Sequence, residues 1–440
     1  MINLTKEINK ASLADFQANL NHDVSNNALK NAVSEVGIFK ATQNFDAKSK
    51  LNPVFNIEVP TGKVSNQKRS GRCWLFSSLT NLRTEFATRY NMKDFELSQN
   101  YLSFYDRLEK ANYFFQNIVE TADLPVTDRK VNWLFTCPSG DGGQWQYAAN
   151  LIEKYGVVPD YVMPETVASD NTSEFNATIN KLLRKDGIEI REMIKNNQPT
   201  DERIQQMLSD IYRICVYSFG QPPVEFELSL KDDDGKIIEE PTITPLDFLK
   251  NYFSLDLDDY IGVMNSPQES KKYNQSYTID TQGNIVGGVQ EKFFNLPIER
   301  LKELTIQQLK GNDTVWFGND VGNQSERRQG LLFGDMYQYD QLFGIDTKMT
   351  KGEALDYGNA SVTHAMVFTG ANVINDVPNR WKVENSWGEE NGNKGYFTMD
   401  DEWFDNNVYE VVINKKYFTD QELAAYAEDP IVLPAWDAME

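Results

Sequence analysis

The hydrophobic periodicity of this chain changes along its length, from helical spacing to strand-like alternation. Residues 73–90, CWLFSSLTNLRTEFATRY, carry apolar or small side chains at helical spacing without proline or glycine, and they predict a buried helix that begins near Arg72. A second helical segment starts at Glu96. From about residue 312, segments such as THAMVFTGANVI and RWKVENSW are rich in β-branched and aromatic residues and predict strands. Helices first and strands last favour an α+β fold whose two layers meet at a cleft.

Composition excludes several classes of protein. The formal net charge of −22 repels phosphate backbones, so we expect no nucleic-acid partner. The three cysteines (Cys73, Cys137 and Cys215) show neither a C-x-x-C pair nor disulfide-framework spacing, which favours a reducing compartment and gives no reason to expect a metal or cofactor. The N-terminus lacks the apolar core of a signal peptide, and no segment approaches the length of a membrane span. We therefore expect a cytoplasmic protein without membrane contact.

Cys73 is the candidate nucleophile. A thiol attacks a carbonyl carbon only as the thiolate, which requires a helix N-terminus, a nearby cation or an imidazolium to lower its pKa. Cys73 follows Gly71 and Arg72 and opens the predicted helix. A lone cysteine is more often a small buried apolar residue. The position of Cys73 at the start of a helix favours the catalytic interpretation instead.

The chain has two histidines, and one of them stands in a promising context. His22 lies in the polar N-terminal region, whereas His364 lies at the edge of a strand-like run. A cysteine hydrolase needs a base, so His364 is the candidate. Asn385 follows in VENSWG, and its side-chain oxygen can accept from the imidazole and fix the ring, while Trp387 can cover that hydrogen bond. The competing interpretation of ENSWG is a plain exit from a strand into a turn.

Gln67 lies six residues before Cys73. Its side-chain amide can donate to a developing oxyanion together with the backbone N–H of Cys73. A glutamine at this spacing carries little weight by itself and gains it from the other residues.

The order Q-x5-C-W, then H, then N-S-W-G, then G-Y-F resembles the papain family. Ser70 stands where the papain motif has its first cysteine, Arg72 replaces a small residue, and Cys73 and His364 are about 290 residues apart, about twice the papain spacing. With these departures, the chain resembles the aminopeptidase C and bleomycin hydrolase family over roughly residues 60–437. The resemblance rests on NQKRSGRCWLFSSLTNLR, FELSQNYLSFYDRLEKANYF, DGGQWQ, VWFGNDVG, THAMVFTG, VENSWGEENGNKGYF and LPAWD.

The resemblance implies a papain-like two-layer fold, in which a helical half and a β-barrel-like half meet at an active-site cleft, with a large insertion. It divides the chain into an N-terminal arm (1–60), a helical half with the catalytic cysteine (61–160), a family-specific insertion (161–310), a β-rich half with the histidine and asparagine (311–430) and a C-terminal arm (431–440). It also implies a homohexamer with active sites that face a central channel.

The resemblance assigns roles to several residues. Cys73, His364, Asn385 and Gln67 are expected to be catalytic. Gly142 and Gly143 are expected to pair with the substrate backbone, because glycine permits close approach of two chains. Trp387 and Glu440 are the other expected substrate-binding residues, Glu440 because the family's C-terminal arm lies in the cleft and its carboxylate can meet a substrate α-ammonium. Asn319 stands where the family has a cysteine.

The expected function is that of a cysteine peptidase that acts on short peptides through a Cys-His-Asn triad. The sequence ends at Glu440, a few residues short of the family's pattern, which would retract the terminal carboxylate by roughly 10 Å. We therefore expect endopeptidase action, with strict release of N-terminal residues as the alternative. Acyl transfer by the same triad is a further possibility. A non-catalytic scaffold is disfavoured because none of the four catalytic candidates has been lost.

Overall fold

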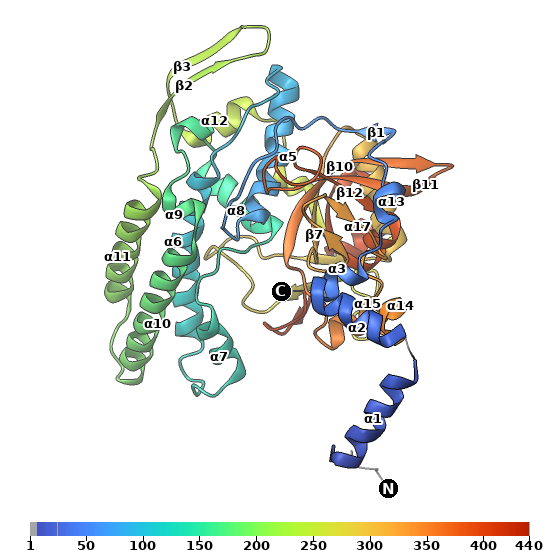
Figure 1. The fold of residues 1–440 in the computed structure, drawn as a ribbon. Coiled ribbons are helices and arrows are strands. Elements are labelled where there is room, and N and C mark those ends of the chain that lie inside the picture. Colours follow the sequence, from blue (N-terminus) through green and yellow to red (C-terminus); the bar gives the residue numbers. More distant parts are fainter. Residues whose placement is uncertain (1–6, 24, 440) are drawn as a thin grey trace. The chain divides into compact units, whose positions relative to one another are not determined.

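The computed structural model describes residues 7–23 and 25–439, and the chain divides into two compact units (Figure 1). The smaller unit comprises Met1–Lys50 and Asp335–Lys348. The larger unit comprises Leu51–Gly334 and Met349–Glu440. All candidate catalytic residues belong to the larger unit.

The smaller unit joins N-terminal helices to a distant segment of the chain. Its helices are α1 (Lys10–His22), α2 (Ser25–Val36), α3 (Ile38–Thr42), α4 (Ala47–Lys50) and α14 (Tyr339–Phe343). The ring of Phe39 packs edge-on against that of Tyr337 with centroids 5.5 Å apart, and the Asn44 side-chain amide donates to the Asp335 carbonyl at 3.0 Å. The N-terminal segment therefore has a packing partner near residue 337, which its sequence alone did not indicate.

The first part of the larger unit is helical. Its helices are α5 (Cys73–Tyr90), α6 (Gln99–Glu120), α7 (Arg129–Thr136), α8 (Trp145–Tyr155), α9 (Val167–Asp170), α10 (Ser173–Lys195), α11 (Asp201–Phe219) and α12 (Pro245–Tyr252). Helices were predicted to begin near Arg72 and near Glu96, and α5 and α6 confirm both predictions. The α6 helix starts where it does because the Ser98 hydroxyl caps the N–H of Tyr101. Helices α8, α10 and α11 pack around α6.

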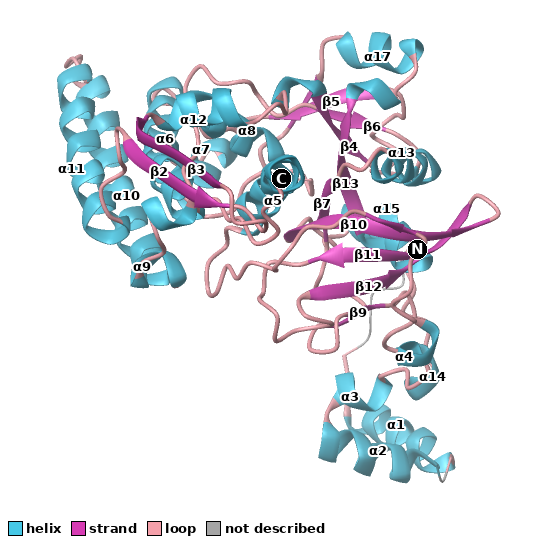
Figure 2. Cartoon of the chain, turned by 90° about the horizontal axis from the view of Figure 1, so that it is seen from above, coloured by secondary structure: helices cyan, strands magenta, loops and turns pink. Residues whose placement is uncertain are grey.

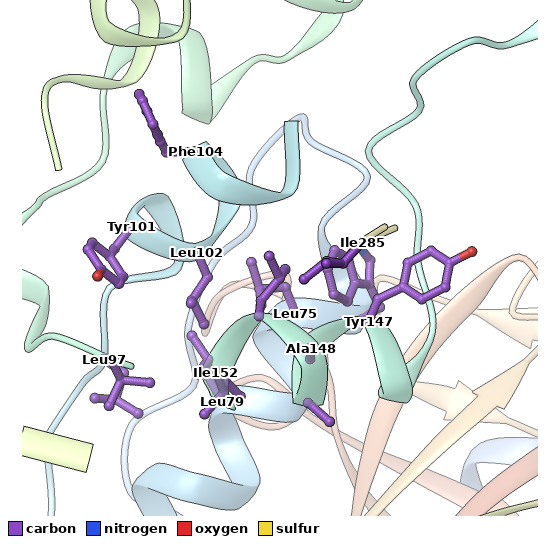
Figure 3. Packing of buried hydrophobic residues seen from close by; sticks show 14 of the residues in the cluster. Leu75, Leu79, Leu97, Tyr101, Leu102, Phe104, Tyr147, Ala148, Ile152 and Ile285 are labelled. Atoms are coloured by element: carbon purple, nitrogen blue, oxygen red, sulfur yellow. The ribbon is translucent and has the colours of Figure 1, made fainter. Parts of the chain in front are cut away.

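Buried side chains from α5, α6 and α8 form one core. Leu75 and Leu79 of α5 lie beside Ala148 and Ile152 of α8, as Figure 3 shows. Twelve residues of α5 are buried. A helix buried on most of its circumference is held in position by packing, so its N-terminal residue is placed firmly.

Strands follow in the second part of the larger unit. The main sheet contains β1 (Ile57–Glu58), β4 (Tyr260–Met264), β5 (Gln275–Ile279), β6 (Phe293–Asn295), β7 (Val315–Asn319), β8 (Ser325–Glu326), β9 (Leu331–Leu332), β10 (His364–Ile374), β11 (Val377–Glu384), β12 (Tyr396–Asp400), β13 (Val408–Asn414) and β14 (Ile431–Leu433). The strand order is β14-β5-β6-β4-β13-β7-β10-β11-β12-β9-β8, with β1 paired to β10. This order has two free ends, so the described strands form an open sheet and not a closed barrel.

The sheet is covered on both faces. Trp316 of β7 belongs to the core around α5, whereas its neighbour Phe317 packs with residues of α13 (Ile298–Lys310). Successive side chains of a strand point to opposite faces, so α5 and α13 lie on opposite faces of β7. Figure 2 shows the helical half on one side of the larger unit and the sheet on the other. The predicted α+β fold is confirmed.

The remaining elements are peripheral to the site. They are α15 (Lys351–Asp356), α16 (Asp401–Asn407), α17 (Asp420–Ala427), three 3-10 turns (Asp160–Val162, Leu257–Asp259 and Lys415–Tyr417), and a separate hairpin of β2 (Phe226–Lys231) and β3 (Ile237–Ile243). The turn of this hairpin lies at residues 232–236, between the paired strands β2 and β3. Strands β4 to β6 and helix α13 lie within the segment predicted as an insertion, yet they belong to the sheet half. No helix in the described part of the chain has the length and apolarity of a membrane span.

Candidate active site

Cys73 is the first residue of α5, and its thiol is partly buried against the sheet half. The indole of Trp316 donates to the carbonyl of Trp74 at 3.1 Å, which fixes the first turn of α5 to β7. Burial raises the pKa of the Cys73 thiol to about 11, while the backbone N–H groups of Ala365 and Trp74 act in the opposite direction. Ala365 directly follows His364, so the thiol lies next to the start of β10.

His364 and Asn385 are brought together by neighbouring strands. His364 opens β10 and Asn385 follows the last residue of β11, which pairs with β10. The Nε2 atom of His364 lies 2.8 Å from Oδ1 of Asn385. The same oxygen accepts the backbone N–H of Ser386 at 2.8 Å, so it is an acceptor and Nε2 carries the proton. The unprotonated Nδ1 is therefore the nitrogen that can act as a base.

The imidazole of His364 is held by several contacts. Trp387 packs over it with ring centroids 4.8 Å apart. Asn319 pairs with His364 across β7 and β10, and its side-chain amide donates to the His364 carbonyl at 3.0 Å. Burial lowers the pKa of His364 to about 4, the hydrogen bond to Asn385 raises it, and the positive charge of Arg327 lowers it. Burial thus favours the neutral imidazole as well as the neutral thiol.

Gln67 is fixed at both ends of its side-chain amide. Its Oε1 accepts the hydroxyl of Ser386 at 2.5 Å, and its Nε2 donates to the carbonyl of Ser70 at 2.5 Å. One N–H of the amide is left for another acceptor, which is the requirement for an oxyanion donor. Ser386 therefore links Gln67 to Asn385. Its hydroxyl donates to Gln67, and its backbone N–H donates to the Asn385 side chain.

Asp141 joins the start of α5 to the loop that precedes α8. Its Oδ2 accepts the backbone N–H of Gly71 at 2.6 Å and the hydroxyl of Thr172 at 2.5 Å. Its carbonyl accepts the indole N–H of Trp74 at 2.8 Å. A Cβ at Gly71 would lie 2.6 Å from the Asp141 carboxylate, so this close approach requires glycine.

Two buried cationic side chains, Arg107 and Lys110, contact the loop that contains Asp141. Arg107 is fully buried, with Nη2 3.5 Å from the Asp141 carboxylate. Lys110 donates to the carbonyl oxygens of Gly140 at 3.2 Å and Gly142 at 2.6 Å. Desolvation raises the pKa of the Asp141 carboxylate. The positive charge of Arg107 and the hydrogen bonds that the carboxylate accepts outweigh this effect, so the net shift of the pKa is downward.

A cavity of about 960 Å³ opens above these residues. Its lining includes Gln67, Cys73, His364 and Trp387 from the predicted site, and also Gly142 and Gly143. A Cβ on Gly143 would lie 2.8 Å from the Trp74 ring, whereas one on Gly142 would meet nothing within 4 Å. Gly142 therefore faces open space, and its carbonyl accepts a hydrogen bond from Lys110. At position 143 a glycine is needed because Trp74 leaves no room for a side chain.

The predicted site residues that the structure describes lie together. Gln67, Cys73, His364, Asn385 and Trp387 form one connected set together with the glycine loop. Glu440 lies outside the described residues. The described end of the chain is anchored nearby: Asp437 forms a 2.6 Å ion pair with Lys271, and Met439 is buried. Among the described residues, no group of three or more His, Cys, Asp or Glu side chains is placed to hold a metal.

Three supporting residues were not assigned a role from the sequence. Ser386 stands inside the N-S-W-G motif and Asp141 inside DGGQW, so the motifs marked their positions but not their contacts. Asn319 was noted only for its residue type.

A partly buried thiol at a helix start, an imidazole held in one tautomer and a positioned amide are the groups required for nucleophilic attack on a carbonyl.

Residues 7–440 match the model of the Peptidase C1-like family. The chain is 44% identical over 442 residues to aminopeptidase C of Lactobacillus delbrueckii subsp. lactis, covering 99% of this chain and 98% of the relative. It is 42% identical over 436 residues to aminopeptidase C of Listeria innocua, covering 99% of each. The crystal structure of PepW from Lactobacillus rhamnosis HN001 matches with a TM-score of 0.98 and 44% identity over 99% of each chain.

The fold and these matches define a cysteine-type peptidase with a papain-like fold. The chain belongs to the Peptidase C1-like family. The predicted resemblance to aminopeptidase C is confirmed.

Proposed function

We propose that this chain is an aminopeptidase that releases N-terminal residues from short peptides, with Cys73 as nucleophile, His364 as base and Asn385 as the residue that orients the histidine. The observation that carries this proposal is the 2.8 Å contact between Nε2 of His364 and Oδ1 of Asn385, beside a thiol at the start of α5. The names of the relatives support release of N-terminal residues, the alternative considered above, over endopeptidase action.

The first half of the reaction forms a thioester. Nδ1 of His364 takes the thiol proton as the Cys73 sulfur attacks the carbonyl carbon. The carbonyl oxygen becomes an oxyanion, which the free amide N–H of Gln67 and the backbone N–H of Cys73 stabilise. The C–N bond then breaks, and the imidazolium of His364 gives its proton to the leaving amine.

The second half releases the amino acid. His364 takes a proton from a water molecule, whose oxygen attacks the thioester carbon. The C–S bond breaks, the thiolate leaves, and the imidazolium returns the proton to it. Asn385 accepts from Nε2 throughout, so the ring keeps one orientation as Nδ1 gains and loses its proton.

Endopeptidase action is the second candidate, and one observation favours it. None of the described residues 431–439 lines the cavity. Residues 431–439 in this position would not block a substrate that extends beyond its first residue. The position of the Glu440 carboxylate decides between the two candidates, because that group is the expected partner of a substrate α-ammonium.

One digestion separates these candidates. A peptide of about eight residues is incubated in two forms, with a free and with an N-acetylated N-terminus, and products are read by mass spectrometry. Stepwise loss of N-terminal residues from the free form alone supports the proposal, and internal cleavage of the acetylated form contradicts it. Cys73→Ala is the control, because any cleavage that survives it comes from a contaminant.

A further inference from the structure

The cavity carries two cations on the side where the leaving amine must depart. His364 has to reach the leaving nitrogen to protonate it, so the wall beyond His364 is the leaving-group side. Trp387 packs on the His364 ring and belongs to this wall. Lys68 and Arg327 also line the cavity, and neither forms an ion pair with any residue in the described part of the chain.

Arg327 lies over Trp387. Its guanidinium carbon is 5.9 Å from the centre of a Trp387 ring, and its side chain is exposed. Its charge reaches the imidazole, since it contributes to the lowered pKa of His364. Arg327 therefore lies close to His364, the residue that protonates the leaving amine in the proposed reaction.

Lys68 lies on the same wall of the cavity, because the backbone just before it is hydrogen-bonded to the segment that carries Trp387. Asn66 forms a β-bridge with Trp387, and the N–H of Gln67 donates to the Ser386 carbonyl at 2.8 Å. Lys68 follows with φ 54°, and its N–H donates to Oδ1 of Asn66 at 2.9 Å. A lysine rarely adopts this left-handed conformation, so its direction is set by the turn and not by its own preference.

Asp320 is the one acidic residue among the described residues that line the cavity, and its oxygens already accept hydrogen bonds. They accept the N–H of Gly322 at 3.0 Å and the side-chain amide of Asn323 at 2.7 Å, with the Thr363 hydroxyl at 3.4 Å. Burial raises the pKa of Asp320. Lys68 and Arg327 thus place two positive charges on this wall, against the single carboxylate of Asp320 among the described lining residues, although the whole chain carries −22.

We propose that Lys68 and Arg327 bind a carboxylate on the residue that follows the cleaved bond, which makes dipeptides the preferred substrates. In a dipeptide that residue carries the C-terminal carboxylate, which lies about 3.5 Å of extended chain beyond the cleaved bond. A guanidinium suits a carboxylate because it can donate two parallel hydrogen bonds. This inference rests on the proposed function, since it assigns His364 to the leaving amine.

The test compares dipeptides with and without a carboxylate on the second residue. Leu-Ala and Leu-Ala-NH2 differ in the C-terminal carboxylate, and Leu-Asp-NH2 places a carboxylate on the side chain of the same residue. Without a local cation site, the acidic protein would favour the amide, which carries the extra positive charge. We expect kcat/KM for the free acid to exceed that for the amide by about fivefold at low salt, and the ratio to fall toward one at 1 M salt.

Arg327→Met and Lys68→Met are the test variants, and Arg328→Met is the matched control. Arg328 is the exposed neighbour of Arg327 and is not among the residues that line the cavity. Each test variant should lower the acid-to-amide ratio, and the double variant should bring it to one or below, while Arg328→Met keeps the ratio of the natural chain. A ratio that stays unchanged in the double variant overturns the proposal, as does an equal loss on both substrates.

Binding separates this inference from the proposed function. Calorimetry with the Cys73→Ala variant measures Leu-Ala and Leu-Ala-NH2 without turnover. Tighter binding of the acid that Arg327→Met removes supports the carboxylate site even if the digestion shows endopeptidase action. Equal binding of both ligands contradicts it even if the digestion shows an aminopeptidase. Leu-Asp-NH2 tells the two sources of carboxylate apart: if it matches Leu-Ala, the site accepts acidic residues as well as chain ends.

Discussion

The carboxylate of Asp141 accepts the backbone N–H of Gly71 at 2.6 Å, although the two residues are 70 positions apart in the sequence. This bond holds the turn before Cys73 against the loop that carries Gly142 and Gly143. The papain motif has a cysteine where this chain has Ser70, so a disulfide partner is missing at this place. Here the Asp141 carboxylate, which accepts hydrogen bonds from several donors, joins the two segments without a covalent bond.

Asp141→Ala should lower both stability and turnover. The change removes the ion-pair partner of the buried Arg107. Loss of one partner from a buried pair costs about 3 kcal/mol, the lower end of the usual range because Asp141 is itself 17% exposed. Chemical denaturation measures the stability, and kcat measures the position of Cys73. The double variant Asp141→Asn with Arg107→Met should recover stability; a double variant as unstable as Asp141→Ala would contradict the electrostatic explanation.

Cys73→Ala should abolish turnover and leave the fold intact, because the residue is small and the helix is held by its neighbours. Iodoacetamide should label Cys73 faster than Cys137, which is exposed, and far faster than Cys215, which is buried. His364 takes the proton as the Cys73 sulfur attacks the reagent, so Cys73 needs no resting thiolate, and His364→Ala removes that advantage. Mass spectrometry of labelled peptides gives the three rates; equal rates at Cys73 and Cys137 would count against the assignment.

The pH profile should reflect the buried imidazole. Below its pKa His364 already holds a proton and cannot take one from the thiol, so kcat/KM should fall at a pH near 4 and not near the ordinary histidine value of 6.5. The basic limb should lie at alkaline pH, since burial raises the thiol pKa to about 11.

Two substitutions should move the acid limb in opposite directions. Asn385→Ala removes a hydrogen bond that raises the His364 pKa, so the limb should move to lower pH, with a lower kcat. Arg327→Met removes a positive charge that lowers the pKa, so the limb should move to higher pH. Profiles of kcat/KM with Leu-Ala-NH2 test both shifts, and a common direction would refute the assigned causes.

Gln67→Ala should lower kcat by about 10²–10³ if its amide stabilises the oxyanion. Ser386→Ala should have a smaller effect of the same kind, because it frees Oε1 of Gln67 without removing the donor. Steady-state kinetics on one dipeptide separates kcat from KM. A raised KM with unchanged kcat in Gln67→Ala would make Gln67 a substrate contact instead.

We also propose that the chain assembles as a homohexamer, as its family resemblance implies. Light scattering after size exclusion should give about six times the 50.4 kDa mass of one chain. A monomer at micromolar concentration would refute the assembly and the central channel expected with it.

The sequence predicted the parts of the site that depend on residue type and local pattern. The start of α5 followed from its uninterrupted apolar spacing, and His364 followed because the alternative, His22, lies in a polar segment. The contacts of Asp141, Asn319 and Ser386 were not predicted, because they depend on which distant segments pack together. The same reason applies to β4, β5 and β6, whose short runs gave no sign that they extend the main sheet beyond β13.

His364 and Cys73 come from opposite ends of the larger unit, and the ribosome makes them at different times. About 290 residues separate them, so at 5–20 residues per second the thiol emerges about 15 to 60 s before its base. On the proposed mechanism, a growing chain that has not reached His364 holds a cysteine without its base and cannot attack peptides around it. On the proposed mechanism, this separation along the chain delays activity until the segment that carries His364 has been made.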